Sequence, residues 1–141
     1  CESRYTHGMS RDLIERYYRA FNQGDRAGML ALLTDDVAHD VNQGARELGK
    51  AAFSKFLQRM DTCYREQLQD IVIMGNPEGT RFAAEFLVLG EYLRTDTGLP
   101  PATGQRYRLP AGAFIEVKDG QISRVTTYYN LQEWLTQVGA R

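Results

Sequence analysis

Residues 107–129 read YRLPAGAFIEVKDGQISRVTTYY and decide the fold class. Two runs rich in β-branched, aromatic and other apolar residues, at 107–117 and 122–129, flank the tetrapeptide Lys118-Asp119-Gly120-Gln121. An Asp-Gly pair between two such runs is a strong signal for a tight β-hairpin turn. The stretch therefore predicts two long antiparallel strands.

The residues before this hairpin predict a longer meander. Residues 81–93 are rich in Phe, Leu, Val and Tyr and indicate a long strand. Residues 68–74 indicate another strand, which the turn-forming sequence GNPEG at 75–79 ends. Residues 95–104 contain two glycines and Pro100-Pro101, a composition typical of a loop.

Helical patterns occupy the first part of the chain. Ser10 is expected to cap a first helix, Asp25 a second and Asn130 the final one. A third helix is expected from Ala52 to Met60, and a strand at 37–41 after Thr34-Asp35-Asp36 ends the second helix. The first helix has apolar residues at helical spacing: Leu13, Ile14, Tyr17, Tyr18 and Phe21. Helices segregated from a strand meander predict an α+β fold.

The composition is that of one globular domain. Of 141 residues, 43% are hydrophobic and 25% charged, with a formal net charge of -1. This balance predicts neither nucleic acid nor a membrane as a partner, and no apolar run is long enough for a transmembrane helix. Two cysteines without a leader peptide favour a cytoplasmic location. Residues 1–8 are expected to be a flexible arm or a remnant of a cloned extension, and residues 9–138 the domain.

Several motifs resemble a known superfamily. The sequence RYYRAFNQGD at 16–25, followed by LLTDD at 32–36, is similar to the opening of ketosteroid isomerases and SnoaL-like polyketide cyclases. The motifs HDVNQG at 39–44, YREQ at 64–67 and LPAGAF at 109–114 resemble the bacterial ketosteroid isomerase-related proteins. Membership of this nuclear-transport-factor-2-like superfamily implies a curved antiparallel sheet wrapped on helices as a cone with one central pocket.

The steroid isomerases of this superfamily use an aspartate base, an oxyanion-stabilising tyrosine and a protonated aspartate. The resemblance places the tyrosine at Tyr17, the base at Val41 and the second aspartate at Gly112. Because adjacent strand residues point to opposite faces, Asp40 reaches the pocket only if a bulge turns it inward. His39 shares the face of Val41, and its imidazole is suited to act as a base.

A second catalytic precedent in this superfamily is limonene-epoxide hydrolase, which needs an Asp-Arg-Asp arrangement. The resemblance places its last aspartate at Thr127, and the facing strand has Phe86 and Val88. Without these carboxylates, epoxide hydrolysis is not expected.

Further residues are candidates for lining the pocket. Tyr92 and Tyr129 have the parity of the pocket face, and Arg108 shares strand parity with Gly112 and Phe114. A guanidinium there would suit a carboxylate or enolate. The leucines Leu87 and Leu89 are expected on the outer sheet face, where they favour a homodimer interface.

Three hypotheses of function remain open from the sequence. The first is an isomerase or cyclase that transfers protons on a small hydrophobic carbonyl compound, with Tyr17 stabilising an oxyanion and His39 or Asp40 moving the proton. The second is a non-catalytic protein that binds a small hydrophobic molecule, with a carbonyl or a carboxylate. The third is a dimeric assembly module. No metal-ligand spacing or phosphate loop is evident, and no cofactor is expected.

Overall fold

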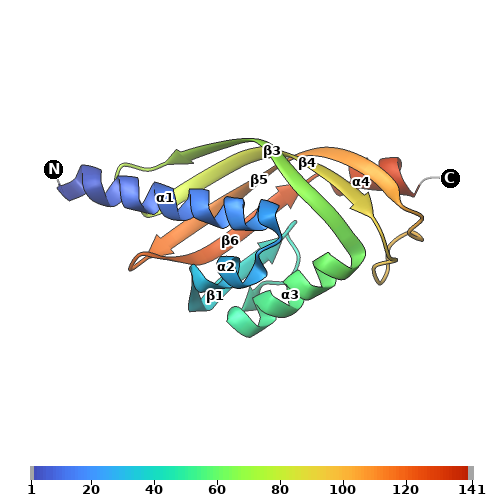
Figure 1. Ribbon diagram of the computed structural model, residues 1–141, viewed down its shortest axis with the longest axis horizontal. Helices are drawn as coiled ribbons and strands as arrows, with labels where there is room; N and C mark the ends of the chain where they lie inside the picture. Colours follow the sequence, from blue (N-terminus) through green and yellow to red (C-terminus); the bar gives the residue numbers. More distant parts are fainter. Residues whose placement is uncertain (1, 140–141) are drawn as a thin grey trace.

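The computed structural model describes residues 2–139, and side chains from Ser10 onward. Four helices and six strands follow one another along the chain (Figure 1). In order they are α1 (Glu2–Gln23), α2 (Arg26–Ala31), β1 (Leu33–Val41), β2 (Glu47–Leu48), α3 (Lys50–Cys63), β3 (Tyr64–Gly75), β4 (Arg81–Tyr92), β5 (Gln105–Lys118), β6 (Gln121–Tyr129) and α4 (Leu131–Val138).

The strands form one curved, unclosed sheet in the order β2-β1-β6-β5-β4-β3. Its strands arc over α1, α2 and α3, with α4 at one end (Figure 1). The α+β class and the curved sheet on helices are confirmed. The sheet is antiparallel except between β1 and β6, which run parallel.

The β5–β6 hairpin forms as its sequence predicts. Asp119 and Gly120 have φ values of 52° and 75°, and two consecutive positive φ angles match the twist of the flanking strands. Along β4 the buried positions alternate, so that Phe82, Phe86 and Val88 face the helices. The helices contribute the opposite side of the core, with Ile14 and Phe53 almost fully buried.

Three elements begin four or more residues earlier than the sequence predicts. Helix α1 begins at Glu2 rather than Ser10, so helical backbone extends through residues 2–8; the origin of residues 1–8 stays a prediction. Helix α2 ends at Ala31, and strand β1 begins at Leu33, where it pairs with Ile122 of β6, so residues 34–36 belong to the strand. Strand β3 follows α3 directly and begins at Tyr64 rather than at residue 68.

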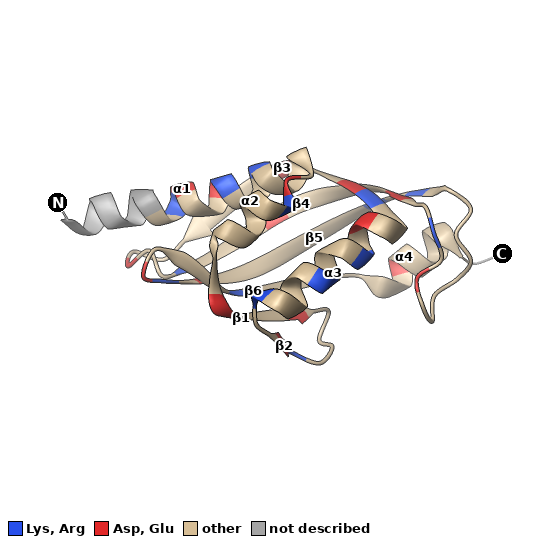
Figure 2. Cartoon of the chain, turned by 60° about the horizontal axis from the view of Figure 1, so that its bottom comes forward, with Lys and Arg blue, Asp and Glu red and all other residues tan. Residues whose placement is uncertain are grey.

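Charged residues of both signs are interspersed along α1, α3 and the strands (Figure 2). None of the helices in residues 2–139 has the length and apolar character needed to span a membrane.

Asn22 connects α1 by hydrogen bonds to β3, the long strand at the edge of the sheet. Its side-chain amide donates to the carbonyl of Leu68 at 3.0 Å and accepts from the amide of Leu68 at 2.8 Å. Gln67 adds a third hydrogen bond, to the carbonyl of Asn22 at 2.8 Å. These contacts satisfy backbone groups of β3 where no further strand pairs with it, and they hold α1 across the sheet.

We expect Asn22→Ala to destabilise the protein by about 1–3 kcal/mol, because it leaves both polar groups of Leu68 without their partner. Urea unfolding followed by circular dichroism measures the effect. Gln23→Ala removes an exposed amide from the next position of the same helix and serves as the control. Equal unfolding free energies for the two variants would contradict this role for Asn22.

Candidate functional site

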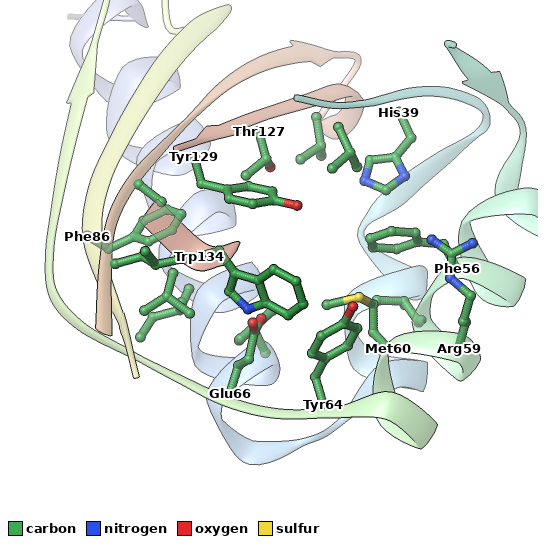
Figure 3. A pocket seen from close by; sticks show the side chains of 18 of the residues that line it. His39, Phe56, Arg59, Met60, Tyr64, Glu66, Phe86, Thr127, Tyr129 and Trp134 are labelled. Atoms are coloured by element: carbon green, nitrogen blue, oxygen red, sulfur yellow. The ribbon is translucent and has the colours of Figure 1, made fainter. Parts of the chain in front are cut away.

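A cavity of about 330 Å³ lies between the inner face of the sheet and the helices (Figure 3). Every helix contributes to its lining, which is rich in aromatic side chains, among them Tyr17, Tyr18, Phe53, Phe56, Phe86 and Trp134. The exposed lining residues Arg59 and Thr97 mark its mouth. An apolar cavity with few polar groups is the usual form of a small-molecule site.

His39 projects from β1 into this cavity (Figure 3). Its ring lies between two phenylalanines of α3, with centroids 4.3 Å from Phe53 and 4.5 Å from Phe56. Burial lowers the pKa of His39, against the opposing effect of Glu47 and Asp40. The imidazole is therefore neutral at neutral pH, and among the described residues it has no hydrogen-bond partner.

Two tyrosine hydroxyls share the cavity with His39. Tyr17 on α1 is only 4% exposed, and burial holds its pKa well above the ordinary value. Tyr129 at the end of β6 points its hydroxyl into the open centre, and burial raises its pKa as well (Figure 3). Neither hydroxyl has a hydrogen-bond partner among the described side chains and backbone groups. Both are thus neutral donors available to a ligand.

Asp40 lies on the opposite face of β1. It accepts hydrogen bonds from Arg46 at 2.8 and 2.9 Å and from the hydroxyl of Thr126 at 2.6 Å. The hydrogen bond from Arg46 is the main reason why the pKa of Asp40 falls to about 2. The register of β1 against β6 shifts between Leu33 and Ala38, which does not turn Asp40 inward, so the condition for its expected alternative role at the pocket is not met.

The expected parity of β5 is also wrong. Tyr107, Leu109 and Ala111 line the cavity, whereas Arg108 and Phe114 are exposed and Gly112 is absent from the lining. The backbone of Arg108 pairs instead with the side chain of Gln137 on α4, at 2.8 and 3.0 Å. The buried apolar positions of β5 decide which face is inward, and the motif around Gly112 carried no information about it.

Of the other candidate residues, some line the cavity, and one holds a neighbouring loop in place. Phe86, Val88 and Thr127 line the cavity, as does Val41 at the position that the resemblance gives to the isomerase base. Tyr92 is fully buried but does not line it. Its hydroxyl donates to the carbonyl of Pro100 at 2.7 Å and accepts from the amide of Asp96 at 2.9 Å, which fixes the 95–104 loop.

Two carboxyl groups of the cavity were missed by sequence reasoning. Glu66 on β3 accepts a hydrogen bond from the hydroxyl of Tyr107 at 2.5 Å. Asp96 accepts one from Tyr64 at 2.8 Å and lies 3.6 Å from Arg59. Glu66 shares the inward parity of Leu68, so a strand extended back to Tyr64 would have shown it. Asp96 lies in a loop, where periodicity says nothing.

The described residues contain no cluster of three His, Cys, Asp or Glu side chains placed to hold a metal ion. The polar groups of the cavity are suited instead to hydrogen bonding and proton transfer. A neutral imidazole accepts a proton, and the tyrosines donate hydrogen bonds to a developing oxyanion.

Comparisons with solved structures give three close relatives. A protein described as a "putative polyketide cyclase" from Xanthomonas campestris pv. campestris is 60% identical, with a TM-score of 0.90, and the match covers 94% of this chain and 98% of that one. Proteins with the same description from Pseudomonas putida and Silicibacter sp. are 55% and 54% identical, each with a TM-score of 0.91. These matches cover 92% and 93% of this chain and 98% and 96% of the others.

More distant structures share the fold. An NTF2-like protein from Burkholderia xenovorans is 14% identical, with a TM-score of 0.76 over 94% of this chain and 97% of that one. Curated proteins gave no match. The SnoaL-like domain profile matches residues 14–125, which include α2, α3 and strands β1 to β5 in full. This chain therefore belongs to the SnoaL-like domain family.

Proposed function

We propose that the cavity catalyses proton transfer next to the carbonyl group of a small hydrophobic compound, as an isomerase or cyclase. The observation that carries this proposal is one apolar cavity with a neutral, unpartnered imidazole at His39 and unpartnered tyrosine hydroxyls at Tyr17 and Tyr129. The 54–60% identical relatives are each described as a "putative polyketide cyclase", and this description supports the same class.

In this mechanism a ring nitrogen of His39 takes a proton from the carbon next to the carbonyl. The electron pair of the broken C–H bond moves to the carbonyl oxygen, which accepts hydrogen bonds from Tyr17 and Tyr129 as an enolate. Where a carbon–carbon double bond is conjugated with the enolate, the imidazolium returns its proton to the far carbon of this dienolate, which shifts the double bond and completes an isomerisation. Alternatively the enolate carbon attacks a second carbonyl of the same molecule and the new alkoxide takes the proton, which completes a cyclisation. The aromatic lining excludes water and strengthens each of these interactions.

Deuterium exchange tests the proton transfer without knowledge of the natural substrate. The probe is 2-tetralone, a bicyclic aromatic ketone with acidic protons beside its carbonyl, and proton NMR in deuterated buffer follows their loss. We expect exchange above the buffer rate. We expect His39→Gln to lower the enzymatic rate by about 10²–10⁴-fold, the usual contribution of a general base.

Asp40→Asn changes the neighbouring residue on the other face of β1 and is the matched control, with thermal unfolding to confirm that both variants fold. Exchange no faster than in buffer, or equal rates in the wild type and His39→Gln, would show that this mechanism is wrong. Binding of the ketone without exchange would favour a non-catalytic binding protein.

The tyrosines have a separate expected effect. Tyr17→Phe and Tyr129→Phe each remove one hydroxyl from the cavity and keep the ring that packs there. Loss of an oxyanion donor costs about 10²–10³-fold in rate in other enzymes, and we expect a decrease of this order for whichever hydroxyl contacts the enolate. The same exchange experiment measures it. If neither variant slows exchange, the proposed oxyanion contact is wrong.

The rate should also depend on pH in a defined direction. Only the neutral imidazole accepts a proton, and burial lowers the pKa of His39 below its ordinary value of 6.5. Exchange should therefore be constant at neutral pH and fall only at pH values below about 6.5, as the imidazole becomes protonated. A rate that falls already above this value would contradict a neutral His39 as the base.

We also propose that two copies pair through the outer sheet face. This face has Leu87 and Leu89 at half-buried positions, and exposed Phe114 contacts exposed Tyr128 with ring centroids 5.9 Å apart. Light scattering after gel filtration should give a dimer mass for the wild type and a monomer mass for Phe114→Glu. Leu131→Glu, on α4, introduces the same charge at another exposed apolar position as the control. A monomeric wild type would contradict the interface.

A further inference from the structure

Glu66 presents an unpartnered carboxyl oxygen to the cavity. Tyr107 donates its hydrogen bond to Oε2, and among the described residues Oε1 has neither a hydrogen-bond donor nor an ion-pair partner. Glu66 belongs to the cavity lining and appears in Figure 3 beside Trp134. Glu66 is half-buried, and an acceptor that lines a cavity without a protein partner is a natural contact for a ligand.

Three neighbouring strands hold this carboxyl in place. Glu66 on β3 is the partner of Gly90 on β4, and Gly90 is the partner of Tyr107 on β5. The ring of Tyr107 crosses over Gly90 to reach Glu66, since a Cβ atom at residue 90 would lie only 2.2 Å from its Cζ. Trp134 packs edge-on against the Tyr107 ring, with centroids 6.0 Å apart. The glycine is therefore required for the Tyr107–Glu66 hydrogen bond.

No cation of the cavity neutralises Glu66. Arg59 is the only arginine or lysine among the described lining residues; its side chain is 60% exposed and pairs with Asp96. Arg26 lies outside the lining and is bound to Asp61 at 2.7 Å. Burial raises the pKa of Glu66, and the hydrogen bond from Tyr107 and the charge of Arg26 oppose this shift without cancelling it. The described lining has two acidic residues, Glu66 and Asp96, and Arg59 as its basic residue, so the cavity is unsuited to a ligand that adds a further negative charge.

We propose that Glu66 is a ligand-recognition residue, and that the ligand presents it with an uncharged hydroxyl or carbonyl oxygen rather than a carboxylate. A protonated Glu66 donates to a carbonyl oxygen, and an ionised Glu66 accepts from a hydroxyl group. A ligand carboxylate would instead face a like charge without a compensating cation. The inference rests on the proposed function in the same cavity, and it specifies the substrate class as neutral aromatic or alicyclic hydroxyl and carbonyl compounds.

Two probes with the same ring system test this preference. At about pH 8, 2-naphthol is neutral and 2-naphthoate is an anion, since a phenol titrates near 10 and a carboxyl near 4. Quenching of the Trp134 fluorescence or of the probe itself reports binding. We expect the wild type to bind 2-naphthol at least about ten times more tightly than 2-naphthoate, and Glu66→Gln to reduce this ratio about tenfold. Gln keeps the size of the side chain and an acceptor for Tyr107.

Glu85→Gln is the matched control, because it removes the same charge from an exposed position of β4 on the outer face. It should leave the ratio unchanged. Comparable binding of both probes to the wild type, no binding of either probe, or an unchanged ratio in Glu66→Gln would overturn the inference. The ratio of the 2-naphthol and 2-naphthoate affinities in the wild type tests the inference even if Glu66→Gln fails to fold.

The two proposals fail in different ways. Catalysed exchange on 2-tetralone together with an unchanged probe ratio in Glu66→Gln would overturn the role of Glu66 and leave the proton transfer standing. If Glu66→Gln changes the ratio of the two probe affinities but 2-tetralone shows no catalysed exchange, the ligand class is supported and the proposed catalysis is wrong.

Discussion

The parallel pairing of β1 with β6 is the constraint on which the site depends. It sets His39 beside Val125 and Val41 beside Thr127, and the amide of Asn42 continues the pairing by donating to the carbonyl of Thr127 at 2.8 Å. This pairing adds β1 to the sheet beyond the antiparallel meander and brings it over α3. Without it, His39 would not lie between Phe53 and Phe56 in the same cavity as Glu66 on the far strand.

Burial has the same consequence for the imidazole and the phenols of the cavity. It lowers the pKa of His39 and raises those of Tyr17 and Tyr129, so that the neutral form is favoured in each case. Asp40 shows the contrast on the outer face, where Arg46 and Thr126 stabilise its charge and bring its pKa to about 2. The two faces of β1 therefore separate a charged structural network from neutral groups that can exchange protons.

Prediction from sequence succeeded where periodicity was strong. The hairpin turn, the alternation of β4 and the amphipathic α1 followed from local patterns. The resemblance to the superfamily implied the places of Tyr17, Phe86 and Val88 at the cavity, and they lie there. It failed where a strand boundary or parity was uncertain. A one-residue error in parity moved Arg108, Gly112 and Phe114 to the wrong face, and a strand begun four residues late concealed Glu66.

The sequence by itself determined the α+β class, the order of the long strands and the family, because these depend on local periodicity and on motifs contiguous in the chain. Only the tertiary structure decided which polar groups share the cavity. Glu66, Gly90 and Tyr107 lie on three separate strands and meet through sheet register, while Tyr92 uses its hydroxyl to fix a loop. Such contacts join residues distant in the chain, so no local pattern encodes them.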